Sequence, residues 1–274
     1  MPSLKQITQE LLASINRRPQ KRLGQNFLID PTILRRIVDT ADIKPEDTII
    51  EIGTGLAILT KELADRAKKV ITIEIDQELL KLSKEILAKY NNIDYILGDI
   101  LKIDYQKVIQ GLKNYKIVAN LPYYITAPIM EKILDVDNPP ALAVLTVQKE
   151  VVERMASKPG SKIYGSFSVF CQFYGEVKLI SLIQKFAFFP QPEVSSAIVK
   201  ITPHTKPFLT GAAKEKFFDV MHAAFQQRRK TLSNSLKEFN IQNWPVDPMR
   251  RPETLSLEEF IGIAAACYNH GVQK

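Results

Sequence analysis

From residue 48 onwards, short apolar runs alternate with segments of helical periodicity, and this alternation restricts the possible folds more than any other feature of the sequence. Runs such as TIIEIG have the length and residue types of buried strands. Strands that alternate with helices form a mostly parallel sheet covered on both faces. The sequence therefore predicts an α/β fold with seven strands, at residues 48–53, 69–75, 93–97, 115–120, 141–148, 176–183 and 195–203. Little helix separates the last two, which are expected to form an antiparallel pair at one edge.

The two ends of the chain differ from this alternating part. Residues 1–14 predict a basic N-terminal arm with one helix around residues 4–15. Near residue 205, the segment TPHTKPF contains two prolines and is typical of a linker. Only helical patterns follow it, at residues 214–226, 229–238 and 256–269. We therefore expect an α/β domain over residues 15–203 and a small helical domain over residues 206–274.

A glycine turn follows the first predicted strand, in the segment EIGTGLAI. Gly53 and Gly55 allow the backbone to turn tightly and to approach a ligand at the carboxyl edge of the sheet. Glu74 ends the second strand and can accept hydrogen bonds from both hydroxyls of a ribose. Asp99 follows the third strand, where a carboxylate can meet an adenine amino group. These strand ends predict a site for an adenosine-containing cofactor.

Two cofactors fit such a site. The dinucleotide fingerprint requires a third glycine, but this chain has Ile58 at that position. S-adenosylmethionine has no phosphates and carries a positive charge, which suits Glu51, Glu74 and Asp99. We therefore expect S-adenosylmethionine, and an NAD-dependent oxidoreductase is a distant alternative. The histidines and cysteines show no metal-ligand spacing, so no metal site is predicted.

The fourth strand ends in NLPYYI, which brings an amide, a proline and two tyrosines to the same edge. The side-chain oxygen of Asn120 and the carbonyl of Leu121, fixed by the rigid proline that follows, can accept the two N–H groups of an exocyclic adenine amine. Tyr123 offers a ring on which a flipped base can stack. This pattern predicts methyl transfer to a base amine, a reaction in which positioning supplies much of the rate.

Positive charge is concentrated at the two ends of the chain, which has 37 basic and 30 acidic residues and a net charge of +7. Residues 1–24 contain five basic side chains and one acidic side chain. Residues 214–251 contain eight basic side chains and four acidic ones. Such concentrated charge favours a phosphate backbone as partner. No apolar run is long enough to span a membrane and no apolar signal core precedes the arm, so we expect a cytoplasmic protein that has no membrane partner.

Several motifs make the chain resemble the KsgA-type ribosomal RNA adenine dimethyltransferases, a class I (Rossmann-like) methyltransferase family. These motifs cover about residues 15–262 and are GQNFL, EIGTG, GD, NLPY, QKEVVERM, KIYGSFSV, FFPQPEVSSAI and FQQRRKTLSNSL. The resemblance implies dimethylation of N6 of two adjacent adenosines near the 3′ end of small-subunit ribosomal RNA, by a monomer. In this family a proline usually occupies the position of Thr54. A ribosome-assembly factor that acts mainly by binding RNA, and an erythromycin-resistance-type methyltransferase of large-subunit RNA, are the alternatives.

The resemblance also implies roles for individual residues. Phe188 is expected to stack on the target base from the side opposite Tyr123, although the neighbouring Phe189 is an alternative. The expected cofactor site consists of Asn26, Leu28, Gly53, Gly55, Glu74, Asp99 and Asn120. The expected RNA contacts are Arg228, Arg229 and Lys230 of the QRRK segment, together with Lys149 and Arg154 on a helix near the catalytic edge.

Overall fold

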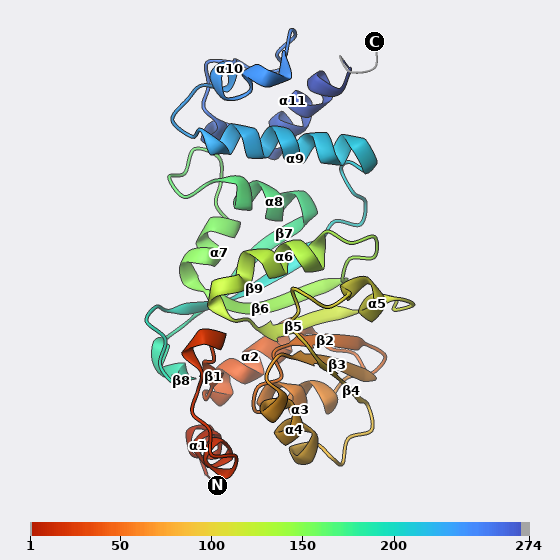
Figure 1. Cartoon of the computed structure of the whole chain (residues 1–274), viewed down its shortest axis with the longest axis vertical. Helices are drawn as coiled ribbons and strands as arrows, with labels where there is room; N and C mark the ends of the chain where they lie inside the picture. Colours follow the sequence, from red (N-terminus) through yellow and green to blue (C-terminus); the bar gives the residue numbers. More distant parts are fainter. Residues whose placement is uncertain (1, 270–274) are drawn as a thin grey trace. The chain divides into compact units, whose positions relative to one another are not determined.

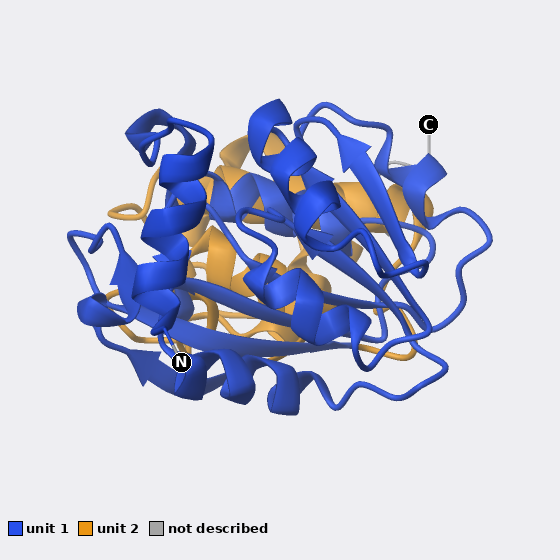
Figure 2. Cartoon of the chain, turned by 90° about the horizontal axis from the view of Figure 1, so that it is seen from below, with its two compact units in different colours: residues 1–152, 178–203 blue, residues 153–177, 204–274 orange. Residues whose placement is uncertain are grey.

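The computed structural model describes residues 2–269; residue 1 and residues 270–274, which belong to the predicted arm and helical tail, lie outside it. The chain divides into two compact units, shown in blue and orange in Figure 2. One unit comprises Met1–Val152 and Lys178–Pro203, and the other comprises Glu153–Val177 and His204–Lys274. The second unit therefore includes residues 153–177 in addition to the C-terminal helices.

A seven-stranded sheet forms the centre of the first unit, in the order β4-β3-β2-β5-β6-β9-β7 (Figure 1). Strands β4, β3, β2, β5 and β6 pair in parallel, and β9 pairs antiparallel with β6. The predicted mostly parallel seven-stranded sheet, with its last two strands at one edge, is thus confirmed. The strands are β2 (Thr48–Ile52), β3 (Lys69–Glu74), β4 (Ile93–Leu97), β5 (Lys116–Asn120), β6 (Leu142–Gln148), β7 (Gly175–Ile183) and β9 (Ser196–Pro203).

The strand order reverses next to β2, and this reversal determines where a ligand can bind. From β2 the chain continues outward through β3 and β4, and it then returns to place β5 on the other side of β2. At such a switch point the connections leave in opposite directions, so a crevice opens at the carboxyl ends of the two strands. Gly53 follows β2 and Asn120 ends β5, and a Cβ atom added to Gly53 would lie 3.8 Å from the Asn120 carbonyl oxygen.

Several helices of the first unit begin at side-chain caps. Asp30 accepts hydrogen bonds from the backbone N–H groups of Thr32 and Ile33, and Pro31 occupies the first helical position of α2. Asp76 caps α4 in the same way. The helices are α1 (Leu4–Ser14), α2 (Pro31–Ala41), α3 (Ile58–Ala64), α4 (Gln77–Ile86), α5 (Tyr105–Ile109) and α6 (Thr126–Leu134). Helix α7 (Lys149–Met155) begins in the first unit, and its last three residues belong to the second. Short 3-10 helices are η1 (Lys21–Leu23), η2 (Tyr123–Ile125) and η3 (Lys185–Ala187).

Residues 29–47 carried no predicted element, and a second, two-stranded sheet is present in addition to the predicted strands. Helix α2 occupies the first of these regions, where the Asp30-Pro31 pair was an available start signal. The small sheet pairs β1 (Phe27–Leu28) with β8 (Phe188–Phe189) antiparallel, so Leu28 lies opposite Phe188. Strands of two residues have no periodicity to detect, and these two come from distant parts of the chain.

The second unit contains α8 (Ser166–Tyr174), α9 (Gly211–Gln226), α10 (Leu232–Ser235) and α11 (Leu257–Asn269), with η4 (Lys237–Phe239) and η5 (Pro252–Thr254). Its core includes Phe173 and Phe217, whose rings stack with centroids 4.7 Å apart. The helix predicted at residues 229–238 is shorter than expected, because residues 227–230 form a turn before α10. In the described part of the chain, no helix has the length and hydropathy needed to cross a membrane.

A buried network of hydroxyls surrounds Glu51 in β2. Its Oε2 atom accepts hydrogen bonds from Thr60 and Thr72, both at 2.7 Å. The hydroxyl of Thr54 lies 2.6 Å from that of Thr72, so the residue that replaces the usual proline joins the network. Glu51 Oε1 has no partner among the described residues. Burial raises the pKa of Glu51 to about 8, so the side chain is largely protonated at neutral pH.

We predict that Glu51→Gln stabilises the protein at alkaline pH. An unfolded glutamate loses its proton near its ordinary pKa of 4.5, whereas the folded one keeps it until about 8. Its contribution to stability is therefore complete below 4.5 and is lost as the pH rises to about 8. A glutamine amide oxygen can accept both threonine hydroxyls and cannot ionise. The difference in Tm between variant and parent should grow from pH 5 to pH 8.5 in thermal unfolding.

Glu85 on α4 is exposed and provides the matched control. Glu85→Gln should leave the pH profile of Tm close to that of the parent. Parallel pH profiles for the parent and Glu51→Gln would show that Glu51 is ionised in the folded state.

Candidate active site

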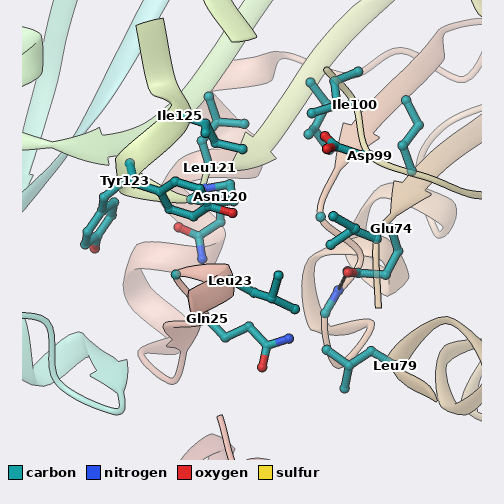
Figure 3. A pocket seen from close by; sticks show the side chains of 18 of the residues that line it. Leu23, Gln25, Glu74, Leu79, Asp99, Ile100, Asn120, Leu121, Tyr123 and Ile125 are labelled. Atoms are coloured by element: carbon teal, nitrogen blue, oxygen red, sulfur yellow. Dashed lines mark hydrogen bonds between the residues drawn. The ribbon is translucent and has the colours of Figure 1, made fainter. Parts of the chain in front are cut away.

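A cavity of about 250 Å³ lies at the switch point of the sheet, and all its lining residues belong to the first unit. Residues 23–27 form one part of its wall, and segments that follow β2, β3, β4 and β5 form the rest. Figure 3 shows Asn120 and Tyr123 on one side, and Glu74 and Asp99 on the other. One wall of the cavity therefore carries the amide and the aromatic ring at the end of β5 and in η2. The opposite wall carries the two carboxylates.

Glu74 connects the glycine turn to the start of α4. Its Oε2 atom accepts from the backbone N–H of Gly55, and its Oε1 atom accepts from that of Asp76, both at 2.9 Å. The side chain is 6% exposed, and burial raises its pKa above the ordinary value. A carboxylate has about four lone-pair sites, so each oxygen can accept a further hydrogen bond from a ligand hydroxyl in the cavity.

The cavity has the polarity expected for S-adenosylmethionine. Glu74 and Asp99 are its charged residues, and no Lys, Arg or His occurs among its lining side chains, all of which lie in the described part of the chain. Apolar side chains, including Ile75 and Ile100, adjoin the two carboxylates and can contact a flat ring. A site with negative charge and no cation suits a positively charged cofactor and disfavours the pyrophosphate of NAD.

Asn120 and Leu121 present two acceptors at the end of β5. The Nδ2 atom of Asn120 donates to the backbone carbonyl of Asn26 at 3.0 Å, which fixes the orientation of the amide. Among the described residues, no donor reaches the Asn120 side-chain oxygen or the Leu121 carbonyl. The Leu121 N–H donates to the Thr146 carbonyl at 3.1 Å, and this bond holds the backbone in place. Both residues line the cavity.

Tyr123 also lines the cavity and is fixed at its hydroxyl. That hydroxyl lies 2.5 Å from Ser196 Oγ, at the start of β9. Burial raises the pKa of Tyr123, so the phenol stays protonated at neutral pH. An aromatic ring held at its polar end is a rigid surface for a planar ligand.

The structure brings eight of the predicted site residues to this cavity: Asn26, Gly53, Gly55, Glu74, Asp99, Asn120, Leu121 and Tyr123. Leu28 and Phe188 pair across the small sheet and are buried at 7% and 1% exposure, and their expected contacts with the cofactor and the target base stay predictions. Phe27, the neighbour of Leu28, lines the cavity. Phe189 is half-buried and packs near Phe27, so neither Phe188 nor Phe189 lines the cavity. Glu51 lies within the core instead of around the site.

Several lining residues were not predicted, chiefly the segment Leu23–Gln25 and the apolar side chains next to the two carboxylates. Ile75 is 47% exposed although it directly follows a buried strand. An isoleucine that follows a strand-ending carboxylate was an available signal for a ring-binding surface. For residues 23–25 the only signal was the GQNFL motif, and the position of this segment depends on contacts with Asp76 made by Gln20 and Gln25.

The predicted RNA-binding residues lie on several elements. Arg229 and Lys230 are exposed in the turn after α9. Arg228, by contrast, donates from Nη2 to the carbonyls of Tyr164 at 2.8 Å and Lys162 at 3.3 Å. Lys149 begins α7 and is exposed. Arg154, near the end of the same helix, has its guanidinium 5.5 Å from the centre of the Phe167 ring.

Comparison with known sequences identifies the relatives of this chain. The model of a family described as "Ribosomal RNA adenine dimethylase" matches residues 16–249. Ribosomal RNA small subunit methyltransferase A of Bacillus cytotoxicus is 43% identical over 269 residues, covering 92% of both chains. The protein with the same name from Bacillus cereus is 44% identical over the same length and coverage.

Solved structures agree with the sequence relatives. A dimethyladenosine transferase from Plasmodium falciparum matches with a TM-score of 0.77 and 28% identity, covering 89% of this chain and 98% of that chain. The 23S rRNA methyltransferase ErmE matches with a TM-score of 0.70 and 25% identity, covering 89% of this chain and all of the other. Sequence, fold and cavity thus agree, and the chain belongs to the ribosomal RNA adenine dimethylase family of S-adenosylmethionine-dependent methyltransferases.

Proposed function

We propose that this chain dimethylates N6 of two adjacent adenosines near the 3′ end of small-subunit ribosomal RNA, and that it does so during small-subunit assembly. The relatives named small-subunit methyltransferases are 43% and 44% identical to it, against 25% for the large-subunit enzyme ErmE. An RNA substrate of this kind supports action in the cytoplasm.

The pair of open acceptors at Asn120 and Leu121 carries this proposal. An adenine N6 amine has two N–H groups, and its lone pair is delocalised into the ring. Hydrogen bonds from these N–H groups to the Asn120 side-chain oxygen and the Leu121 carbonyl draw them out of the ring plane and make the nitrogen lone pair available. Tyr123 holds the flipped base from one side.

When bound, S-adenosylmethionine supplies a methyl group on a positively charged sulfur. The target amine would accept this methyl group in place of one hydrogen and would release that proton to solvent. No strong base is required, because the methylated amine is acidic before it loses that proton. After the first transfer one N–H remains, and a single acceptor is sufficient to hold it for the second. Asn120 and Leu121 thus act by orientation.

Glu74 and Asp99 hold the cofactor in this proposal. Glu74 accepts the ribose hydroxyls, for which its two backbone hydrogen bonds keep it oriented. Asp99 is fixed by the N–H of Leu101 at 2.9 Å and receives the adenine amino group of the cofactor. Gly53 and Gly55, both with positive φ, keep the turn close to the cavity without side chains.

Asn120→Ala should reduce single-turnover methylation of unmethylated small subunits by about 100-fold or more, because it removes one preorganised acceptor. The bond to the Asn26 carbonyl is also removed, at a cost of about 1 kcal/mol in folding stability. Affinity for S-adenosylmethionine, measured by calorimetry, should fall by a much smaller factor than the methylation rate, because Glu74 and Asp99 remain.

A variant that binds cofactor and turns over at the parental rate would disprove the role of Asn120. Mapping of modified nucleosides on subunits treated with the parent enzyme tests the reaction itself. If the parent binds subunits and leaves their adenosines unmodified, the alternative of an RNA-binding assembly factor is correct.

Glu74→Ala should weaken S-adenosylmethionine binding by about 1–3 kcal/mol, since charge-assisted hydrogen bonds to the ribose are removed. Glu74→Gln keeps one acceptor oxygen and should bind with intermediate affinity. The exposed Glu78 on α4 supplies the control, because Glu78→Ala removes a nearby charge that does not line the cavity. Equal affinities for all variants in calorimetry would exclude Glu74 from the cofactor site.

Arg229 and Lys230 should bind RNA phosphate, whereas Arg228 also has a structural role. The double change Arg229→Gln and Lys230→Gln should preserve Tm and weaken binding to small subunits. The slope of the logarithm of the binding constant against the logarithm of the salt concentration should become less steep by about 0.7–0.9 for each phosphate that the variant no longer neutralises. Arg228→Gln should instead lower Tm, because two carbonyls are deprived of their donor. An unchanged salt slope in the double variant would place the RNA-binding surface elsewhere.

A further inference from the structure

The two consecutive tyrosines of NLPYYI have different surroundings. Tyr123 is hydrogen-bonded to Ser196 and partly buried. Tyr124 also lines the cavity, but its side chain is 59% exposed and its hydroxyl has no hydrogen-bond partner among the described residues. A large aromatic side chain at the edge of a binding cavity, with neither burial nor a polar partner, is not explained by folding.

Tyr124 nevertheless has a defined position. A Cβ atom added to Gly24 would lie 3.2 Å from both Cδ1 and Cε1 of the Tyr124 ring and 3.3 Å from Pro122 Cβ. Gly24 has φ +62°, in the left-handed region that ends η1. The ring therefore packs against a backbone that has no side chain, and its remaining surface faces solvent.

Two cationic residues lie in the short helix that ends at Gly24. Lys21 and Arg22 lie in η1, and the N–H of Gly24 donates to the Lys21 carbonyl at 3.0 Å. Both side chains are exposed, and neither forms an ion pair with a described residue. No acidic residue occurs in the sequence between Glu10 and Asp30. The edge of the cavity thus has an exposed aromatic ring, and two exposed cationic residues lie close to it in the chain.

We propose that Tyr124, Lys21 and Arg22 form a binding site for the nucleotide next to the target adenosine. This inference rests on the proposed function and extends it to the substrate outside the cavity. When the target base is flipped out, its neighbour is left without a stacking partner, and the Tyr124 ring replaces that partner. The backbone phosphate between the two nucleotides carries the negative charge that Lys21 and Arg22 attract.

The site also fits two successive targets. An aromatic ring stacks on any base, because every base has a π-face. Tyr124 can therefore hold the second adenosine while the first is in the cavity, whether that neighbour is still unmodified or already carries methyl groups. A site built on hydrogen bonds to the N6 amine would no longer recognise a neighbour whose amine had been methylated.

The first test measures equilibrium binding of unmethylated small subunits to the full chain. Tyr124→Ala should weaken binding by roughly 5- to 150-fold, the range expected when one stacked base is released. Tyr124→Phe keeps the ring and should remain within about threefold of the parent. Phe186→Ala is the matched control, because Phe186 is 65% exposed and does not line the cavity. Parental affinity for Tyr124→Ala, or an equal decrease for Phe186→Ala, would overturn the site.

The second test changes the charge. The double substitution Lys21→Gln and Arg22→Gln should flatten the log–log salt dependence of subunit binding by about 0.7 for each phosphate left without its cation, with cofactor affinity unchanged. An unchanged slope would overturn the role of the two cations. Methylation by the parent enzyme is assayed separately: its absence would refute the proposed function, whereas these binding measurements decide the Tyr124 site by themselves.

Discussion

The carboxylate of Glu74 is the interaction on which the arrangement of the cavity depends. It is buried at the end of β3, and desolvation of a carboxylate is unfavourable unless its oxygens are hydrogen-bonded. Here one oxygen accepts from the N–H of Gly55 in the glycine turn after β2, and the other accepts from the N–H of Asp76, which caps α4. Two strand ends and a helix start are thereby fixed around one side chain. Asp76, whose N–H completes this arrangement, also receives Gln20 and Gln25 from the N-terminal segment, so the cavity wall extends from the same point.

The parts of this structure that could be predicted from sequence are those with a local signal. Strands β2 to β6 are apolar runs of ordinary length, and the polar or glycine residues at their ends meet at one edge because parallel strands share a direction. Leu28 and Phe188 lack such a signal, since their burial results from a two-residue pairing between distant segments. Arg228 belongs to a basic run in the sequence, and only the fold shows that it binds carbonyls of residues 162 and 164.

Thr54 shows how a departure from the family pattern can be accommodated. A proline at this position restricts the turn through its ring. Threonine leaves the backbone freer, but its hydroxyl contacts Thr72, which in turn donates to Glu51. The buried, protonated carboxyl group of Glu51 and the threonine hydroxyls around it thus stabilise the turn that contains Thr54. In this chain hydrogen bonds stabilise the turn, whereas a proline would stabilise it through the covalent ring that fixes φ.

The contact between Gly24 and the Tyr124 ring links two segments that are 100 positions apart in the sequence. Any larger residue at position 24 would have to adopt a left-handed backbone and would also displace the ring. The two positions are therefore epistatic: the tolerance of one to substitution depends on the residue at the other. Over evolutionary time, a change at position 124 to a smaller side chain would remove the contact with the ring, whereas the close approach of Pro122 and the restriction on φ would persist.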